Sequence, residues 1–168
     1  MTDSPPERDP FHLLFVCTGN TCRSPLAEAL ARREAELRGW TRLTVGSAGV
    51  AAAPGAPASA GAIAAAAELD LDLAGHASTP LTPEGVEEAD LILTMASHHL
   101  VRVSELGGAE RAALLTAFAE GEAGEHPLGA SEIPDPFGGP LEEYVRTRDR
   151  LDTLVRQALD RLEPLLAP

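Results

Sequence analysis

The most conspicuous absence in this sequence is lysine. All thirteen basic residues are arginine, and this excludes the lysine-containing phosphate loop of the P-loop nucleotide triphosphatases. Acidic residues are abundant, and the formal net charge is −13 at pH 7. Because a field of that sign repels polyanions, we expect neither nucleic acid nor an anionic membrane surface as a partner.

Cysteines and long apolar segments are also scarce. The two cysteines, Cys17 and Cys22, lie in one short segment, so they cannot join distant elements, and we expect a reducing compartment. No apolar run approaches the length of a membrane span, and the polar, proline-rich residues 1–10 lack the hydrophobic region of a signal peptide. We therefore expect a cytoplasmic protein with a flexible N-terminal tail over 1–10 and a single domain over 11–168.

The rest of the chain alternates between short apolar, β-prone segments and segments with helical periodicity. This alternation predicts an α/β fold, a four-stranded parallel sheet with helices on both faces. We expect residues 47–49 to form the turn after the second strand and 117–131 to form a surface loop that has room for one helical turn. The expected strands are 11–16, 42–46, 90–95 and 111–116, and the expected helices are 25–38, a segment around 63–69, a short one after Thr82, 97–106 and 141–166.

The nine residues CTGNTCRSP, from Cys17 to Pro25, lie between the first expected strand and the first expected helix. The free N–H groups and the dipole at a helix N-terminus attract anions. Gly19 allows the loop to curl its amides inward, and the planar fork of Arg23 can bind two phosphoryl oxygens. This positive environment favours the thiolate of Cys17, which Ser24 can stabilise by a hydrogen bond. The stretch predicts a phosphate site with a cysteine nucleophile.

This arrangement of cysteine, five residues, arginine and serine resembles the signature of cysteine-based phosphatases, and the full string is similar to that of low-molecular-weight phosphatases. The resemblance implies the fold of that family and a catalytic role for Cys17 and Arg23. It also implies a hydrogen-bond network that holds the loop in shape, made by Asn20, Ser24, Ser47 and His76. The loop residues that would bind the phosphate are Thr18, Gly19, Asn20, Thr21, Cys22 and Ser24.

A second chemical element is expected at residues 133–140, IPDPFGGP, where prolines and glycines restrict the backbone around Asp135. DPFGG resembles the general-acid loop of the family. Asp135 would then protonate the leaving group and activate the water that cleaves phosphocysteine, and Phe137 would contact the substrate. No cofactor is expected. His98 and His99 are adjacent and point to different helix faces, so no metal site is expected either.

Two positions differ from the tyrosine-directed members of the family. Those usually have a bulky aliphatic residue in place of Thr21 and two aromatic residues after the acid-loop proline, where this chain has Phe137 followed by glycine. A flat phenyl ring is held less well by one aromatic wall. Together with Thr147-Arg148-Asp149, these features resemble bacterial protein-arginine phosphatases, which implies phosphorylated proteins carrying phosphoarginine as substrates and inorganic phosphate as the product.

Three other functions remain alternatives. A protein-tyrosine phosphatase would share every catalytic residue. An arsenate reductase on the same scaffold would need further cysteines for a disulfide relay, and a non-catalytic phosphoprotein-binding module would be expected to lack the nucleophile or the acid. Cys22 is either a small buried wall of the loop or a resolving thiol that protects an oxidised Cys17.

Overall fold

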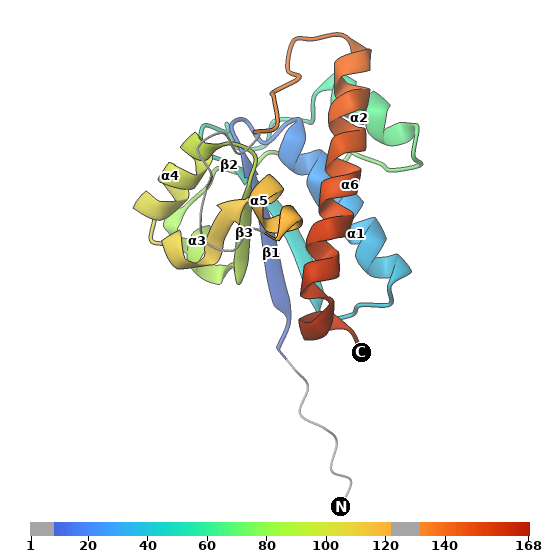
Figure 1. The fold of residues 1–168 in the computed structure, drawn as a ribbon. Coiled ribbons are helices and arrows are strands. Elements are labelled where there is room, and N and C mark those ends of the chain that lie inside the picture. Colours follow the sequence, from blue (N-terminus) through green and yellow to red (C-terminus); the bar gives the residue numbers. More distant parts are fainter. Residues whose placement is uncertain (1–8, 122–131) are drawn as a thin grey trace, which may run out of the picture.

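A computed structural model of the chain describes residues 9–121 and 132–168. Residues 1–8 of the predicted tail and residues 122–131 of the predicted loop lie outside the described part. Within it the elements follow in the order β1 (Phe11–Cys17), α1 (Arg23–Leu37), β2 (Leu43–Gly49), α2 (Ala60–Ala67), α3 (Pro83–Glu88), β3 (Leu91–Thr94), α4 (Ser97–Glu105), the short 3₁₀ helix η1 (Ala109–Arg111), β4 (Ala112–Leu114), α5 (Leu115–Glu120) and α6 (Leu141–Leu166) (Figure 1).

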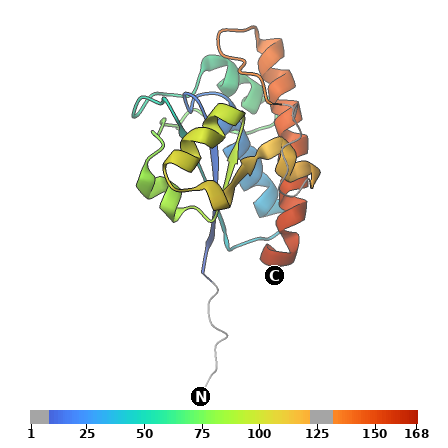
Figure 2. The same cartoon turned by 60° about the vertical axis from the view of Figure 1, so that its left-hand side comes forward.

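The four strands form one parallel sheet in the order β2-β1-β3-β4. Helices α1 and α6 cover one face of the sheet, and α3 and α4 cover the other face, as both Figure 1 and Figure 2 show. The predicted α/β fold, with a four-stranded parallel sheet and helices on both faces, is therefore confirmed. Strand β2 lies next to β1 at one edge of that strand, and β3 lies next to it at the other edge. The order of the strands therefore reverses at β1, and the C-terminal end of β1 is a topological switch point, where α/β sheets bind ligands.

Side chains of the central strand β1 alternate between two apolar layers. Leu13 and Phe15 are fully buried in the larger layer, with residues of α1, α2 and α6. Leu14 and Val16 are buried in the smaller layer, with residues of α3 and α4. Because both faces of the strand are covered, the whole segment is apolar, which is why its sequence was recognisable as a buried strand.

The ends of two predicted strands were wrong. Residues 47–49 were expected to be a turn, but they continue β2, because β1 extends to Cys17 and pairs with β2 up to Gly49. The fourth strand is only Ala112–Leu114, and α5 begins at Leu115. Residues 117–120 of the predicted loop therefore belong to a helix, whose side chains at 115, 117 and 119 are buried.

Short helices begin where their capping residues predict. The Thr82 hydroxyl accepts a hydrogen bond from the N–H of Gly85 at the start of α3, with Pro83 in the first turn. Ser59 caps α2 in the same way through the N–H of Ala62. The Ser59 cap places α2 directly behind the phosphate loop, because its hydroxyl also donates to the carbonyl of Thr21.

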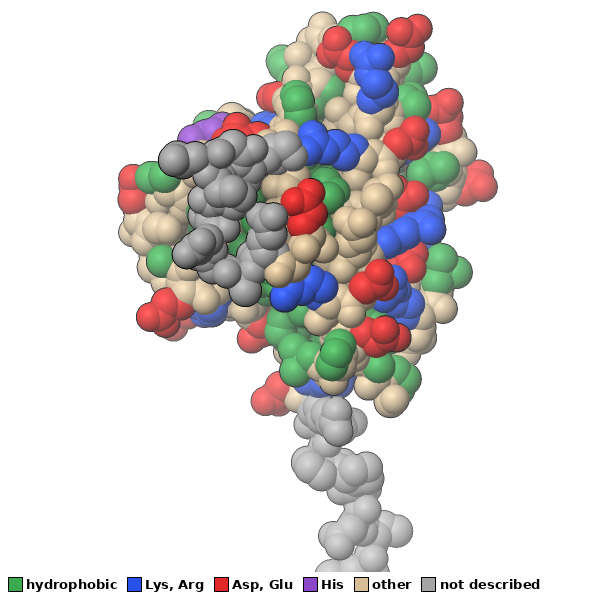
Figure 3. Space-filling model, viewed as in Figure 1, with side chains coloured by type: hydrophobic (Ala, Val, Ile, Leu, Met, Phe, Trp, Pro, Cys, Tyr) green, Lys and Arg blue, Asp and Glu red, His purple; other side chains and the backbone are tan. Residues whose placement is uncertain are grey.

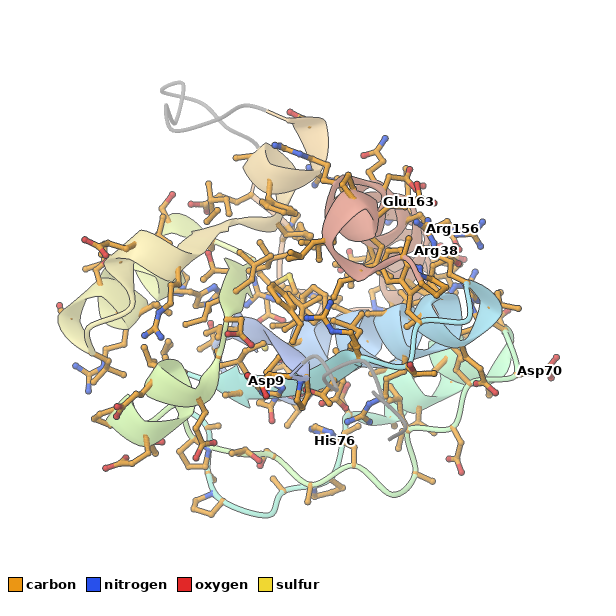
Figure 4. All side chains as sticks on the ribbon, turned by 90° about the horizontal axis from the view of Figure 1, so that it is seen from below. Asp9, Arg38, Asp70, His76, Arg156 and Glu163 are labelled. Carbon is orange, nitrogen blue, oxygen red and sulfur yellow. The ribbon has the colours of Figure 1, made fainter. Side chains whose placement is uncertain are left out.

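Helices α1 and α6 pack side by side, and arginine and acidic side chains cross their seam. Arg33 pairs with Asp152 at 2.7 Å, and Arg38 donates to the carbonyl of Arg156, which lies beside it in Figure 4. Arginine and acidic side chains are interspersed over α6 on the face shown in Figure 3, so the net negative charge does not gather there in one patch. Among residues 9–121 and 132–168, no helix has both the length and the apolar character that crossing a membrane requires.

Candidate active site

The phosphate loop connects the last residue of β1, Cys17, with the first residue of α1, Arg23. It sits at the switch point of the sheet, and the N-terminus of α1 opens toward it. The helix begins with Cys22 as its N-cap, and no side chain caps it. Its first N–H groups are therefore available to an anion, as the sequence predicts.

Asn20 holds the loop in its curled shape. Its backbone has φ +56°, a left-handed conformation that asparagine tolerates better than most residues. Its side chain is fully buried and makes two hydrogen bonds: Nδ2 donates to Ser24 Oγ at 2.8 Å, and Oδ1 accepts from the N–H of Thr79 at 2.9 Å. The Nε2–H of His76 donates to the Asn20 carbonyl at 2.7 Å. The loop is thus anchored to the segment between α2 and α3, on which Figure 4 shows His76.

Of the four residues expected in the supporting network, Asn20, Ser24 and His76 are joined by hydrogen bonds, and Ser47 takes no part in them. The Ser47 hydroxyl is buried and finds no hydrogen-bond partner within the described residues. Because β2 continues past this residue, Ser47 is paired with Phe15 inside the sheet and does not end the strand. It lines a separate cavity of about 710 Å³ between α1 and the loop 69–79, which His76 also lines.

The sulfur of Cys17 lies 2.8 Å from Ser24 Oγ, and both residues are buried. Since Ser24 Oγ already accepts a hydrogen bond from Asn20, its own proton is available for the sulfur. A hydroxyl that donates to sulfur stabilises the thiolate, both when it attacks and when it leaves. The geometry therefore suits the nucleophilic role predicted for Cys17.

Arg23 is buried, and hydrogen bonds hold the two terminal nitrogens of its guanidinium group. Nη1 donates to the carbonyl of Ile133 at 2.9 Å, and Nη2 donates to Thr18 Oγ1 at 3.2 Å. Within residues 9–121 and 132–168, Nε is buried without a partner. Nε–H and one N–H of Nη2 lie along the same edge of the planar group, so this edge can grip two oxygens of a phosphoryl group.

Asp135 stands across from the arginine at the start of the acid loop. Its Oδ2 is 3.7 Å from Arg23 Nη2, and its side chain is about half exposed, at 47%. Its other oxygen accepts a hydrogen bond from the N–H of Phe137 at 3.1 Å, which fixes the carboxylate above the loop. The two motifs are more than 100 residues apart in the chain. They come together because the N–H of Ile133 donates to the carbonyl of Met95, directly after β3.

The predicted catalytic residues line one cavity of about 340 Å³. Asn20 and Ser24 do not line it and lie behind the loop, fully buried. Small residues of the segment after β2 complete the walls, and Phe137 stands at the edge with 70% of its surface exposed. The lining residues are Cys17, Thr18, Gly19, Thr21, Cys22, Arg23, Ala51, Ala53, Ala56, Asp135 and Phe137.

Cys22 is buried at the back of this cavity. Its sulfur is 3.1 Å from Ser59 Oγ, and its thiol donates to the hydroxyl of Tyr144 at 3.8 Å. Burial raises the pKa of Tyr144, and its hydrogen bond with Ser59 opposes part of this effect. Both cysteines are free thiols, so Cys22 can serve as a wall residue and still retain its thiol chemistry.

His99 belongs to the site and was missed by the sequence analysis. It is fully buried at the start of α4, and its Nε2 lies 2.8 Å from Thr18 Oγ1 in the phosphate loop. Burial, helped by the positive charges of His98 and Arg23, lowers its pKa from about 6.5 to about 3. Nothing in the sequence could place it there, because the contact spans 81 residues. Within the described part of the chain, no three His, Cys, Asp or Glu side chains form a group able to hold a metal ion.

Comparison with known proteins agrees with this geometry. Residues 12–165 match the family described as low molecular weight phosphotyrosine protein phosphatase. The protein-arginine-phosphatase of Bacillus subtilis is 42% identical over 151 residues, which are 90% of this chain and 96% of that protein. The low molecular weight protein-tyrosine-phosphatase Wzb of Escherichia coli is 35% identical over 87% of this chain and 91% of its own.

Solved structures show the same similarity. The YwlE arginine phosphatase from Geobacillus stearothermophilus superposes with a TM-score of 0.81 and 37% identity, over 93% of this chain and 95% of the other. A mutant of the YwlE arginine phosphatase that carries a phosphorylated active-site serine also superposes with a TM-score of 0.81, at 39% identity, over 91% of this chain and 96% of the other.

Proposed function

Because this chain belongs to the low molecular weight phosphotyrosine protein phosphatase family, we propose that it hydrolyses phosphorylated side chains of proteins, with phosphoarginine as the substrate group. The main support for this proposal is that three residues line one cavity of about 340 Å³: Cys17 with its sulfur, Arg23 with its guanidinium group and Asp135 with its carboxylate. Each of the three groups has the chemistry that one step of the reaction requires.

In the first step the phosphoryl group binds to the loop N–H groups and to the free edge of Arg23. The Cys17 thiolate attacks phosphorus, the bond from phosphorus to the guanidine nitrogen breaks, and protonated Asp135 gives its proton to the departing nitrogen. Arg23 faces the charge that grows on the phosphoryl oxygens in the transition state. The products of this step are arginine and phosphocysteine.

In the second step Asp135, now a carboxylate, takes a proton from water. The resulting hydroxide attacks phosphorus, the phosphorus–sulfur bond breaks, and inorganic phosphate leaves. The hydroxyl of Ser24, 2.8 Å from the sulfur, stabilises the departing thiolate. The mutant YwlE arginine phosphatase with a phosphorylated active-site serine supports a covalent intermediate of this kind.

The shape of the cavity supports phosphoarginine. Its walls beside the nucleophile are Thr21 and alanines of the segment after β2, with Phe137 as the aromatic side chain among the lining residues. A phenyl ring between two aromatic walls gains about 0.5–1.5 kcal/mol of stacking beyond the area it buries, and one of these walls is missing here. A guanidinium group is polar and compact, and a threonine hydroxyl and a carboxylate are suitable neighbours for it.

Protein-tyrosine phosphatase is the second candidate, and the exposed ring of Phe137 favours it, because this ring can stack on a phosphotyrosine ring. The two functions are separated by kcat/KM for a phosphoarginine protein and a phosphotyrosine peptide at matched concentrations. We expect a preference for phosphoarginine, and Thr21→Ile should shift the ratio toward phosphotyrosine. A wild-type preference for phosphotyrosine that Thr21→Ile does not increase would refute this account of specificity.

Two variants test the catalytic roles. Cys17→Ser should lose turnover by at least about a thousandfold, because the hydroxyl is a far weaker nucleophile at neutral pH. Asp135→Ala should lose about 10²–10⁴-fold, the usual contribution of a general acid. Substrate binding should persist in both variants. Turnover that stays close to the wild-type rate after either change would show that another residue performs the step.

We also propose phosphorylated proteins as the partners, inorganic phosphate as the product and the cytoplasm as the location. The free thiols of Cys17 and Cys22 support this location, because cysteines stay reduced in that compartment. Subcellular fractionation of cells that produce the protein would test it.

A further inference from the structure

Three polar side chains converge on the hydroxyl of Thr18, the residue after the nucleophile. His99 Nε2 lies 2.8 Å from Thr18 Oγ1, Arg23 Nη2 lies 3.2 Å away and His98 Nε2 lies 3.4 Å away. The histidines come from the start of α4, which follows β3, the neighbour of β1 in the sheet. The hydroxyl therefore links the phosphate loop and its arginine to a helix that supplies no other part of the site described above.

The direction of the hydrogen bond between His99 and Thr18 follows from one backbone contact. The N–H of Ala96 donates to His99 Nδ1 at 3.0 Å, so Nδ1 carries no proton. A neutral imidazole then has its proton on Nε2, which must donate to Thr18 Oγ1. Arg23 is also a donor, so the hydroxyl accepts two hydrogen bonds and its own proton points away from both donors. His99 is fully buried, so water does not compete for its contacts.

We propose that Thr18 and His99 are positioning residues that hold the guanidinium of Arg23 in its phosphate-binding orientation. This proposal rests on the proposed function only in taking phosphate as the ligand of Arg23. The planar group is fixed at two points, by the Ile133 carbonyl at Nη1 and by Thr18 at Nη2. Together with the covalent attachment of the group to the side chain, these two contacts fix its plane, and they direct the edge with the unpartnered Nε toward the phosphate.

The nearest competitor for Arg23 is the general acid. Asp135 Oδ2 is 3.7 Å from Nη2, too far for a hydrogen bond but close enough to form one after a small rotation about the contact at Nη1. Without the Thr18 hydroxyl, Nη2 would turn to this carboxylate. The ion pair would withdraw the cation from the phosphate and keep the acid ionised, so both phosphate binding and the first chemical step would weaken.

The hydroxyl is tested by a pair of substitutions and a matched control. Thr18→Val removes the hydroxyl at nearly constant volume, and Thr18→Ser keeps it. Thr116→Val makes the same change in α5, where the buried hydroxyl has no partner among the described residues. The measurements are inhibition by inorganic phosphate and kcat/KM for a phosphoarginine protein.

Thr18→Val should weaken inhibition by phosphate about tenfold and lower kcat/KM at least as much, the usual effect of losing a hydrogen bond to a charged group. Thr116→Val should stay within about twofold of the wild type, and Thr18→Ser, which keeps the hydroxyl, should lose less than Thr18→Val. If Thr18→Val binds phosphate as well as the wild type does, or if Thr18→Ser loses as much as Thr18→Val, the proposal is wrong.

His99 is tested by a double-mutant cycle and by its ring nitrogens. His99→Leu should weaken phosphate binding when Thr18 is present and have little further effect in the Thr18→Val background. Equal effects in both backgrounds would overturn the link between the two residues. Nitrogen-15 NMR of the unmodified protein decides the same point if His99→Leu does not fold: the ring should carry its proton on Nε2, and a proton on Nδ1 contradicts the proposal.

Failure of the proposed function would be distinguishable from failure of this inference. A wild-type protein that binds inorganic phosphate but does not hydrolyse phosphorylated proteins would refute the function. Phosphate binding by the Thr18 variants and the position of the imidazole proton would still decide whether Thr18 and His99 position Arg23.

Discussion

Replacing Asn20 should show how much of the loop's shape depends on one side chain. The residue has φ +56°, is fully buried and bonds through its side chain to Ser24 and to the N–H of Thr79. Asn20→Ala removes both contacts and leaves the Thr79 N–H without its acceptor, at a cost of about 1–3 kcal/mol. A left-handed alanine adds about 1–2 kcal/mol.

The expected loss for Asn20→Ala is therefore about 3 kcal/mol in the free energy of unfolding, a large part of the 5–15 kcal/mol that is typical of a domain. Asn20→Gly loses the same contacts but tolerates the left-handed backbone, so it should be about 1 kcal/mol more stable than the alanine variant. Asn20→Asp keeps the acceptor for Thr79 but places a carboxylate at a fully buried position, which costs stability unless the group takes up a proton.

The three variants should rank differently in activity. Asn20→Asp places a negative charge beside Ser24, whose hydroxyl contacts the Cys17 sulfur at 2.8 Å. That charge opposes the thiolate, so kcat/KM should fall by about tenfold or more.

Urea unfolding followed by circular dichroism gives the stabilities, and phosphate release gives kcat/KM. The matched comparison is between alanine and glycine, which differ mainly in backbone freedom. If Asn20→Gly is no more stable than Asn20→Ala, the loop does not require the left-handed conformation at this residue. If Asn20→Asp retains full activity, the side chain does not influence the nucleophile.

Three further predictions concern other parts of the site. A Cβ on Gly61 would overlap the buried ring of Tyr144, so Gly61→Ala should lower the free energy of unfolding by about 1–3 kcal/mol in urea, and an unchanged value would show that α2 can shift away from α6. The pKa of His99 is lowered from about 6.5 to about 3, so between these pH values the unfolded state binds more protons. As pH falls through this window the wild type should lose stability by up to about 1.4 kcal/mol per pH unit more than His99→Gln, and parallel curves for the two proteins would show that His99 ionises normally. Peroxide should oxidise Cys17 to sulfenic acid, which the Cys22 thiol converts to a disulfide with release of water. Activity should then return with a thiol reductant in the wild type and much less in Cys22→Ser, and equal recovery would exclude this protection.

Much of the site could be predicted from the sequence, because its chemistry is concentrated in two short segments. Cys17, Arg23 and Ser24 lie within eight residues, and the strand before them and the helix after them are strong local signals. The prolines and glycines around Asp135 indicate a rigid loop, and this can be recognised without knowing the fold. Segments of this kind are recognisable because local backbone preferences and side-chain type decide their form.

Other features depend on contacts between distant parts of the chain. The end of β2 was wrong because strand length is decided by the neighbouring strand, and residues 47–49 pair with β1 up to Cys17. The error at Ser47 followed from this wrong strand end. Inside a strand the pleat of the sheet decides the direction of the Ser47 side chain, whereas in a turn after the strand the side chain could point toward the phosphate loop. Helix α5 was expected only as one turn within a loop, because six residues carry little helical signal until their apolar side chains are buried.

The sequence by itself determined which residues are the candidates for the nucleophile, the phosphate-binding arginine and the acid, and the order of strands and helices that carries them. Only the tertiary structure decided that Thr79 and His76 hold Asn20, that Ser47 is left without a partner and that His99 reaches Thr18 across 81 residues. The physical reason is that hydrogen bonds are short and directional. The type of a residue indicates which hydrogen bonds it can make. Its partner is decided by where the packed sheet and helices place the donor and the acceptor.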